Sequence, residues 1–168
     1  MTESAAIRLS GPMDPRDGWS AEGCPMAAAF DLVRTRSALL ILREALYGAT
    51  KFGDFAARAG ISEPVAAERL KELVADGLLV QEEYREPGQR ARRRYTLTDK
   101  GAELAPVLLA LKDWGDRWVY DGKSPIELRH VGCGAPVHVE VRCTEGHEVE
   151  HAHDLELLPG PGSRRRRS

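Results

Sequence analysis

The chain has 168 residues, a formal net charge of −2 and 42% hydrophobic residues, which is enough for one packed domain of roughly 100 to 150 residues with additional tails. Its longest apolar run, Ala38–Leu42, is too short to cross a bilayer, and the first residues carry acids where a signal peptide needs a basic and then an apolar stretch. Three scattered cysteines exclude a disulfide framework, so we expect a cytoplasmic protein in a reducing compartment.

The charges are unevenly distributed along the chain. Residues 24–120 contain fifteen basic and fourteen acidic residues, but four of these arginines fall within Arg90–Arg94. Residues 121–163 contain eight acidic and three basic residues, and Arg164–Arg167 then add four positive charges. Because electrostatic fields act locally, Arg90–Arg94 predicts a basic surface patch despite the small net charge.

The N-terminal part predicts a leader followed by two helices. Residues 1–22 are rich in Gly, Pro, Ser and Asp without periodic apolar positions, and we expect them to be disordered. After Pro25, which suits a first helical turn, apolar residues recur at helical spacing at Met26, Ala29, Phe30 and Val33. Ser37 is expected to cap a second, buried helix that stops at Gly48 and carries Leu39, Leu40, Leu42, Ala45 and Leu46.

A helix-turn-helix is predicted next. The segment Lys51–Gly60 is typical of a short helix that ends in glycine, and Ser62 with Pro64 indicates the start of another helix over 62–76. The core-facing residues of this second helix are predicted to be Val65, Leu70 and Leu73. Its outward-facing residues are predicted to be Glu63, Ala66, Ala67, Arg69 and Lys71.

A hairpin and a long helix complete the pattern. A strand over residues 78–84 is followed by the turn residues Pro87-Gly88 and a returning strand, Arg92–Leu97. Thr98 is then expected to cap one helix from Asp99 to Tyr120. Its apolar stripe consists of Leu104, Val107, Leu108, Leu111, Trp114 and Trp118.

Several spaced motifs occur in one order along this part of the chain. They are Cys24-Pro25, Leu39-Leu40-Ile41-Leu42-Arg43-Glu44, Phe52-Gly53-Asp54-Phe55, Ile61-Ser62, the run Arg69–Leu78, and Tyr95-Thr96-Leu97-Thr98-Asp99-Lys100-Gly101. Through them, residues 24–120 resemble the HxlR-type, MarR-like family of winged helix-turn-helix transcription regulators. The expected fold class is therefore mainly α with a small β-hairpin (α+β), followed by a small β-rich, zinc-ribbon-like appendage over 125–158 and a flexible basic tail over 159–168.

The resemblance implies a homodimer that binds double-stranded, near-palindromic operator DNA in the bacterial nucleoid, most simply as a repressor. The recognition helix 62–76 would enter the major groove, and the arginine-rich wing 84–95 would reach the minor groove, whose negative potential attracts guanidinium groups. The predicted DNA-binding residues are Ser62, Glu63, Ala66, Arg69, Arg90, Arg92, Arg93 and Arg94. The chain departs from the family at Pro64, Ala67 and Glu68, where Lys, Thr and Gln are common, so few side chains remain for direct base readout.

Some of these residues have alternative interpretations. Arg69 could instead pair with Glu72 or Glu68 on the helix surface, and the wing arginines could form a solvated hairpin. The dimer interface is predicted on the 99–120 helix at Leu104, Leu108, Leu111, Trp114 and Trp118, although Trp114 and Trp118 could also line a small-molecule effector pocket. Cys24 begins a helix, where the dipole favours a thiolate, so it is the candidate redox or effector site; the alternative is an inert thiol beside Pro25.

The segment 125–158 contains a candidate zinc site. His130-x2-Cys133 and Cys143-x3-His147 flank Val137, Val139 and Val141, which alternate with polar residues as in a strand. This arrangement resembles a reduced zinc ribbon, because each pair can present two ligands to one Zn(II) ion. A ribbon would normally have Cys where Gly146 stands. The alternative is a small metal-free β-appendage.

Three functions are consistent with these patterns. The expected one is a transcription regulator. A winged-helix protein-interaction module without DNA binding is an alternative, because residues 24–120 are nearly neutral. A zinc-dependent enzyme ranks last, since no nucleophile triad or general base accompanies the four Cys and His residues. Duplex binding that weakens steeply with salt would distinguish the regulator from the other two.

Overall fold

The chain forms two compact units in a computed structural model that describes residues 6–20, 22–85 and 91–166. The central unit is Ala29–Val139, and the terminal unit consists of the described residues up to Ala28 together with those from Glu140 onward. Helix α1 (Pro25–Val33) runs across the division between them. Within the described residues, every helix is too short or too polar to cross a bilayer.

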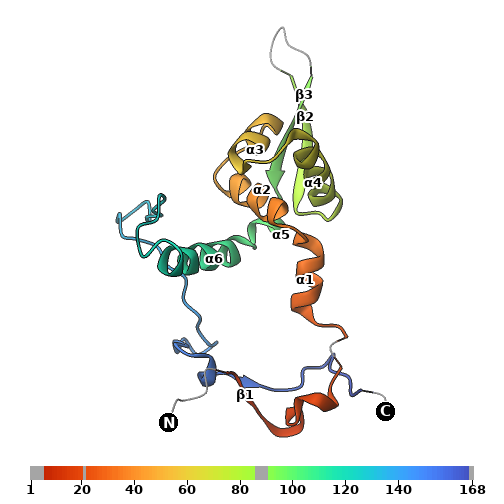
Figure 1. Ribbon diagram of the computed structural model, residues 1–168, viewed down its shortest axis with the longest axis vertical. Coiled ribbons are helices and arrows are strands. Elements are labelled where there is room, and N and C mark those ends of the chain that lie inside the picture. Colours follow the sequence, from red (N-terminus) through yellow and green to blue (C-terminus); the bar gives the residue numbers. More distant parts are fainter. Residues whose placement is uncertain (1–5, 21, 86–90, 167–168) are drawn as a thin grey trace. The chain divides into compact units, whose positions relative to one another are not determined.

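The central unit has the predicted winged helix-turn-helix arrangement (Figure 1). Three helices, α2 (Arg36–Leu46), α3 (Phe52–Ala59) and α4 (Glu63–Ala75), gather beside the antiparallel hairpin of β2 (Leu79–Tyr84) and β3 (Arg92–Leu97). The short helix α5 (Asp99–Ala102) and the longer α6 (Ala105–Trp118) follow. Up to the end of the hairpin, element types and order in this unit agree with the sequence prediction.

One apolar core holds these elements together. Phe55, Ile41 and Leu70 are fully buried where α2, α3 and α4 meet, and each such side chain contributes about 1.5 to 3 kcal/mol relative to exposure. The ring of Tyr95 on β3 meets that of Phe55 edge to face, with centroids 6.1 Å apart. This contact fixes the base of the hairpin against the helices.

The structure corrects two details of the predicted helices. Thr35, not Ser37, caps α2, because the Thr35 side chain accepts a hydrogen bond from the Ala38 backbone N–H at 3.2 Å while Ser37 lies inside the helix. The predicted single helix from Asp99 to Tyr120 is broken between α5 and α6. Pro106 lies in the first turn of α6, and proline cannot donate to the carbonyl four residues earlier, so the helix restarts there.

The buried stripe of α4 is also displaced from its predicted position. Ala66, Leu70 and Leu73 face the core, whereas Val65 is partly exposed. The predictions that Val65 faces inward and Ala66 faces outward are therefore wrong. Positions 66, 70 and 73 have the i, i+4, i+7 spacing of a continuous helical stripe, which Val65 does not complete.

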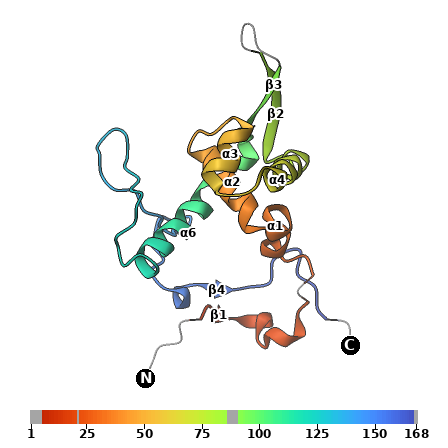
Figure 2. The ribbon, with the colours of Figure 1, turned by 45° about the horizontal axis from the view of Figure 1, so that its top comes forward.

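The terminal unit contains structure where the sequence predicted disorder. Strand β1 (Arg8–Leu9) pairs in parallel with β4 (Glu156–Leu157) (Figure 2), and the short 3₁₀ helices η1 (Gly11–Met13), η2 (Arg16–Gly18) and η3 (Ala152–Asp154) complete the unit. The prediction of a disordered leader is therefore wrong for its described residues. The backbone N–H and C=O groups of β1 form hydrogen bonds with a strand about 150 residues away in the sequence.

The described part of the basic tail is also held in place. The Ser20 N–H donates to the Arg164 carbonyl at 2.9 Å, and the Arg166 N–H donates to the Gly18 carbonyl at 3.0 Å. The Arg165 guanidinium lies 5.5 Å from the centre of the Trp19 ring, a cation–π contact. The prediction of a flexible basic tail is therefore wrong for the described residues up to Arg166.

The predicted strand through Val137, Val139 and Val141 is absent from the described residues. Isolated bridges join Arg129 to Pro136 and Arg142 to Glu148 instead. The Val139 N–H donates to the Asp113 carboxylate on α6 at 2.9 Å rather than to a neighbouring strand. Alternating valines therefore did not suffice for a strand, because no continuous partner strand pairs with them.

Candidate nucleic-acid interface

The turn between α3 and α4 sets the angle at which α4 leaves the core. Gly60 has the left-handed φ of 63°, and its N–H donates to the last carbonyls of α3. The Ile61 N–H donates to the Ala56 carbonyl at 3.1 Å. Glycine adopts this conformation without the Cβ clash of other residues, so it ends α3 and lets α4 begin after two residues.

Helix α4 begins at the protein surface. Ser62 occupies the N-cap position, where the sequence places the start of the helix, but its side chain makes no capping hydrogen bond. Pro64 in the first turn has no N–H to satisfy. The remaining first-turn N–H groups have no side-chain cap, and such groups with the positive end of the helix dipole favour phosphate.

The exposed face of α4 carries fewer candidate base readers than predicted. Glu63, Ala67 and Lys71 are exposed, as expected. Ala66 has an exposed fraction of 0%, so its predicted contact with DNA is wrong. Its methyl group packs into the core instead.

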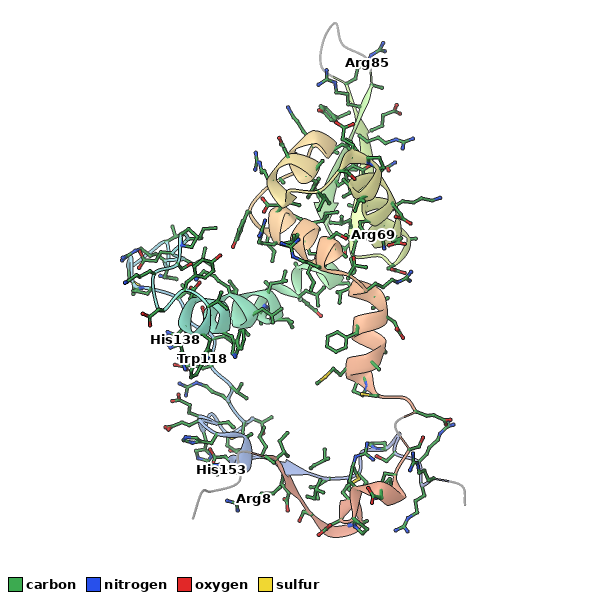
Figure 3. All side chains as sticks on the ribbon, in the orientation of Figure 1. Arg8, Arg69, Arg85, Trp118, His138 and His153 are labelled. Carbon is green, nitrogen blue, oxygen red and sulfur yellow. The ribbon has the colours of Figure 1, made fainter. Side chains whose placement is uncertain are left out.

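Arg69 is engaged within its own helix. Its guanidinium lies 2.8 Å from the Glu68 carboxylate and 2.5 Å from that of Glu72, and only 16% of its side chain is exposed. Of the two interpretations left open for Arg69, the structure shows the ion-paired one. Figure 3 labels its position on α4.

The wing arginines differ from one another in their partners. Arg94 lies opposite Glu82 in the strand register and pairs with it at 2.7 Å. Neither Arg92 nor Arg93 has an ion-pair partner among the described residues, and both are exposed. Arg90 lies outside the described residues. The positive charge available on the described wing is therefore that of Arg92 and Arg93.

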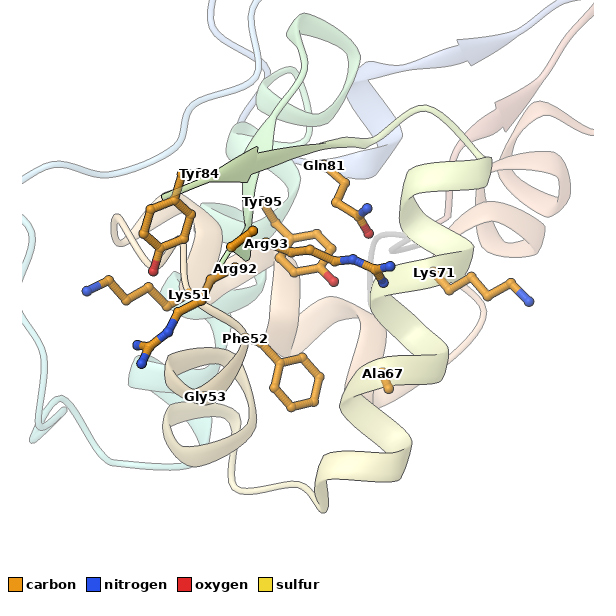
Figure 4. A pocket seen from close by; sticks show the side chains of 11 residues that line it. Lys51, Phe52, Gly53, Ala67, Lys71, Gln81, Tyr84, Arg92, Arg93 and Tyr95 are labelled. Atoms are coloured by element: carbon orange, nitrogen blue, oxygen red, sulfur yellow. The ribbon is translucent and has the colours of Figure 1, made fainter. Parts of the chain in front are cut away.

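These two arginines line a cleft between α3, α4 and the hairpin (Figure 4). The cleft has a volume of about 690 Å³ and is also lined by Lys51, Lys71, Gln81, Tyr84 and Tyr95. Figure 4 shows the Arg93 guanidinium directed toward α4 and that of Arg92 directed toward the side of Lys51. Four cationic residues thus line the cleft beside α4, although Figure 4 shows the Lys71 ammonium directed away from the hairpin.

Two of these cations were not among the DNA-binding residues predicted from the sequence. Lys51 precedes α3 and forms a β-bridge with Arg94, and Lys71 lies on the part of α4 that lines the cleft. The outward position of Lys71 was a usable signal, because it lies on the helix predicted to enter the groove. Lys51 gave no comparable signal, since only the fold brings it beside the hairpin.

The predicted dimer stripe on α6 divides into two parts. Leu104 and Leu108 are partly buried against the core of their own chain. Leu111, Trp114 and Trp118 are 53%, 61% and 69% exposed. An exposed group of this size on one helix is typical of an interaction surface.

Charged residues on α6 pair along the same helix. Lys112 and Asp116 form an i, i+4 ion pair. The hydrogen bond from Lys112 lowers the pKa of the Asp116 carboxyl, and the same bond raises the pKa of Lys112. Both groups therefore stay charged at neutral pH and neutralise each other. The apolar side chains are then the main feature of the exposed part of α6.

Cys24 and the four predicted zinc ligands are exposed. The Cys24 carbonyl accepts from the Ala28 N–H at 3.1 Å, so this residue stands at the start of α1 as predicted. In the central unit, the Cys133 sulfur lies 3.4 Å from His130 Nδ1. In the terminal unit, the Cys143 sulfur lies 3.5 Å from His147 Nδ1. Each Cys–His pair is therefore formed within its own turn.

Comparisons with known proteins agree with this arrangement. The family model described as HxlR-like helix-turn-helix matches residues 32–123. The HTH-type transcriptional regulator Rv3095 of Mycobacterium tuberculosis is 37% identical over 142 residues, which cover 84% of this chain and 89% of that protein. The regulator YvaP of Bacillus subtilis is 36% identical over 101 residues, which cover 59% of this chain and 92% of that protein.

Solved structures show the same similarity. PA1607, described as a candidate transcription factor, superposes with a TM-score of 0.69 at 31% identity and covers 77% of this chain and 90% of its own. The redox regulator HypR in its oxidized form superposes with a TM-score of 0.51 at 26% identity, over 56% of this chain and 96% of its own. From the matched helix-turn-helix, the wing and the relatives that share them, we conclude that this chain belongs to the HxlR-like helix-turn-helix family of transcription regulators.

Proposed function

We propose that this protein binds operator DNA sequence-specifically as a homodimer and represses transcription from it. In each protomer α4 enters the major groove, and the β2–β3 wing lies along the backbone toward the minor groove. The observation that carries this proposal is the cationic cleft between α4 and the wing, lined by Lys51, Lys71, Arg92 and Arg93.

Ion pairing within the chain indicates which cations act on DNA. Arg69 and Arg94 already have carboxylate partners, so a phosphate would have to displace these partners. Arg92, Arg93 and Lys71 have no such partner among the described residues. Phosphate neutralisation supplies most non-specific affinity for DNA, so we assign this role to these three side chains.

Base readout falls to a few side chains at the start of α4. The Ser62 hydroxyl can donate to or accept from a base edge, and the Glu63 carboxylate can accept from the amino group of cytosine. Ala67 can contact a thymine methyl group. With so few groups, sequence-dependent DNA shape read by the wing contributes a large share of specificity in this proposal.

Replacing Arg92 and Arg93 by Ala is expected to weaken binding to every duplex, operator and random sequence alike. Each lost phosphate contact removes one released counterion, so the slope of log affinity against log salt should fall by roughly one unit per contact, about two per protomer. Fluorescence anisotropy across a salt series measures both quantities, with circular dichroism to verify the fold.

The matched control removes an arginine from the same strand that is already paired with a carboxylate, so the unpaired positive charge of the wing does not change. Glu82→Ala with Arg94→Ala deletes the cross-strand ion pair and leaves the net charge unchanged, so its salt slope should stay close to wild type. An unchanged slope in the Arg92, Arg93 variant would contradict wing contact. Wild type that binds no duplex at low salt would favour the protein-interaction module.

The redox role predicted for Cys24 has less support and stays a prediction. The thiol is exposed at the start of α1. HypR is named a redox regulator, which is said of that protein. A small-molecule or redox effector that acts at Cys24 would be consistent with both observations.

We also propose that each of the two Cys–His pairs supplies two ligands for structural zinc. In a tetrahedral site with Zn–S and Zn–N bonds of about 2.3 and 2.1 Å, sulfur and nitrogen are roughly 3.6 Å apart. The Cys133–His130 and Cys143–His147 separations of 3.4 and 3.5 Å are close to this value. Gly134 and Gly146 have φ values of 70° and 84°, so each turn adopts a conformation that glycine permits.

Elemental analysis of protein purified without chelator should then find retained zinc. Cys133→Ser with Cys143→Ser should abolish it and increase amide exchange in residues 125–158. His138→Asn is the control, because this exposed histidine lies outside both turns. A metal-free wild type with the same protected amides would establish the metal-free appendage instead.

A further inference from the structure

The η3 turn of the terminal unit brings together three potential metal ligands. His151, His153 and Asp154 each offer one ligand atom, and these atoms lie within 4.8 Å of one another. Among residues 6–20, 22–85 and 91–166, no other group of three His, Cys, Asp or Glu side chains meets this distance. Figure 3 labels the position of His153 in this unit.

Backbone hydrogen bonds hold the carboxylate of this group in place. The His151 N–H donates to Asp154 Oδ2 at 3.0 Å, and the Asp154 N–H donates to the His151 carbonyl at 3.0 Å. The Leu155 N–H donates to the Ala152 carbonyl at 3.1 Å. The position of Asp154 is therefore fixed by its own turn rather than by either imidazole.

The two imidazoles stand together beside that carboxylate. Their rings stack with centroids 5.0 Å apart and an interplanar angle of 17°. His151 Nδ1 lies 3.8 Å from Asp154 Oδ2, and His153 Nε2 lies 3.7 Å from Oδ1. Both distances exceed the roughly 3.2 Å of an N–H···O bond. Two ligands of one ion with bonds of about 2.1 Å are roughly 3.0 to 3.4 Å apart, so modest side-chain rotations would suffice for coordination.

The surrounding charge favours a cation. Residues 140–158 contain six acidic residues and one basic residue, Arg142. Arg142 is paired with Glu140, so it adds little positive charge near the turn. A negative local field raises the concentration of cations and opposes anions.

We propose that His151, His153 and Asp154 bind one divalent transition-metal ion, with water in the remaining coordination positions. Imidazole nitrogens select ions such as Zn²⁺, Ni²⁺, Co²⁺ and Cu²⁺ over Mg²⁺ and Ca²⁺, which prefer oxygen ligands. Because His151 and Asp154 are exposed, the ion exchanges readily with solution. This separates the site from the retained zinc proposed for the Cys–His pairs.

The position of the turn gives the ion a structural consequence. Strand β4 begins directly after Leu155, whose carbonyl accepts from the Arg8 N–H of β1 at 3.0 Å. An ion that fixes η3 therefore stabilises the parallel pairing of β1 with β4. Hydrogen exchange at the Arg8 amide should become slower when the ion binds.

Calorimetric titration of the untagged full chain with Ni²⁺ tests the proposal. Wild type should bind one exchangeable ion at neutral pH and lose it at acid pH, because a protonated imidazole has no lone pair to donate. His151→Asn with His153→Asn should weaken binding by about 100-fold or more, and Asp154→Asn by about 10-fold, on the scale of measured effects of altered metal sites. In these variants, Ni²⁺ should also protect the Arg8 amide less against hydrogen exchange.

Two control variants locate the ion. His138→Asn removes a histidine outside the turn, and Cys133→Ser with Cys143→Ser removes the other candidate ligands; both should keep the wild-type affinity for the exchangeable Ni²⁺. Absence of Ni²⁺ binding at submillimolar concentration would overturn the proposal. Loss of the ion in the cysteine variant, with retention in the double histidine variant, would overturn it as well.

Discussion

Replacing Leu111 and Trp118 together by Glu is expected to yield a monomer at micromolar concentration and to weaken operator binding by about 100-fold or more. Both side chains lie on the exposed half of α6. Sedimentation velocity measures the first effect, and anisotropy with a full operator measures the second. The β2–β3 wing and α4 are untouched, so affinity for a single half-site should change little.

The size of this effect follows from symmetry. In a two-fold dimer each substitution occurs twice, so four carboxylates would face an apolar interface. A buried, unpaired charge costs about 3 to 5 kcal/mol, more than an interface centred on a few aromatic side chains can offset. A monomer then loses the effective concentration that binding one half-site gives to the second, which is worth about 10²- to 10⁴-fold.

A charge-matched variant separates dimerisation from general acidity. Val131 and Ile126 are exposed apolar residues outside α6, so Val131→Glu with Ile126→Glu adds the same charge and should remain dimeric. Wild type that already sediments as a monomer at micromolar concentration would contradict the proposed interface. A dimeric Leu111, Trp118 variant that fails to bind a small-molecule effector would favour the effector pocket at Trp114 and Trp118.

The order of elements in the central unit was predictable because local signals coincide there. Gly60 ends α3, Pro64 lies in the first turn of α4, and Thr98 caps α5 by accepting from the Gly101 N–H. Each signal acts within a few residues and needs no tertiary contact. The boundaries of β3 agree for the same reason, since Tyr95 and Leu97 alternate with polar residues up to the Thr98 cap.

Side-chain orientation was less predictable than element order. On α4, Val65 and Ala66 are adjacent and both apolar, and the larger Val65 was predicted to face the core although only Ala66 has helical spacing to Leu70 and Leu73. The structure buries Ala66 instead. The partner of Arg94 depends on the register that places it opposite Glu82, which the sequence did not specify.

Long-range pairing was outside the reach of sequence patterns. Strands β1 and β4 have two residues each, too few for a detectable alternation, and they pair across almost the whole chain. The tail contact between Arg165 and Trp19 has the same origin. The three ligands of the η3 turn are close in sequence, but only the stacked imidazoles and the fixed carboxylate distinguish them from ordinary surface histidines.

Gly101 joins the DNA-binding part of the central unit to α6, and no side chain fits at this position. It is buried in α5 beside the start of β2. A Cβ at this position would lie 2.1 Å from the Leu78 carbonyl oxygen and 3.0 Å from Leu97 Cδ2. The same Leu78 carbonyl accepts from the Thr98 N–H at 3.1 Å, so it cannot move away without loss of that bond.

Gly101→Ala is therefore expected to destabilise the protein by about 3 kcal/mol, near the upper end of overpacking effects, because backbone must move rather than a flexible side chain. Thermal unfolding should show a fall in Tm of roughly 10 °C or more. The control is Gly115→Ala in α6, where an added Cβ meets nothing within 4 Å; it should stabilise by up to about 1 kcal/mol because alanine favours helix. Equal Tm values for the two variants would show that α5 does not pack against Leu78 as the structure describes. A selective loss at Gly101 would establish that the contact between α5 and the start of β2 supports the connection to α6.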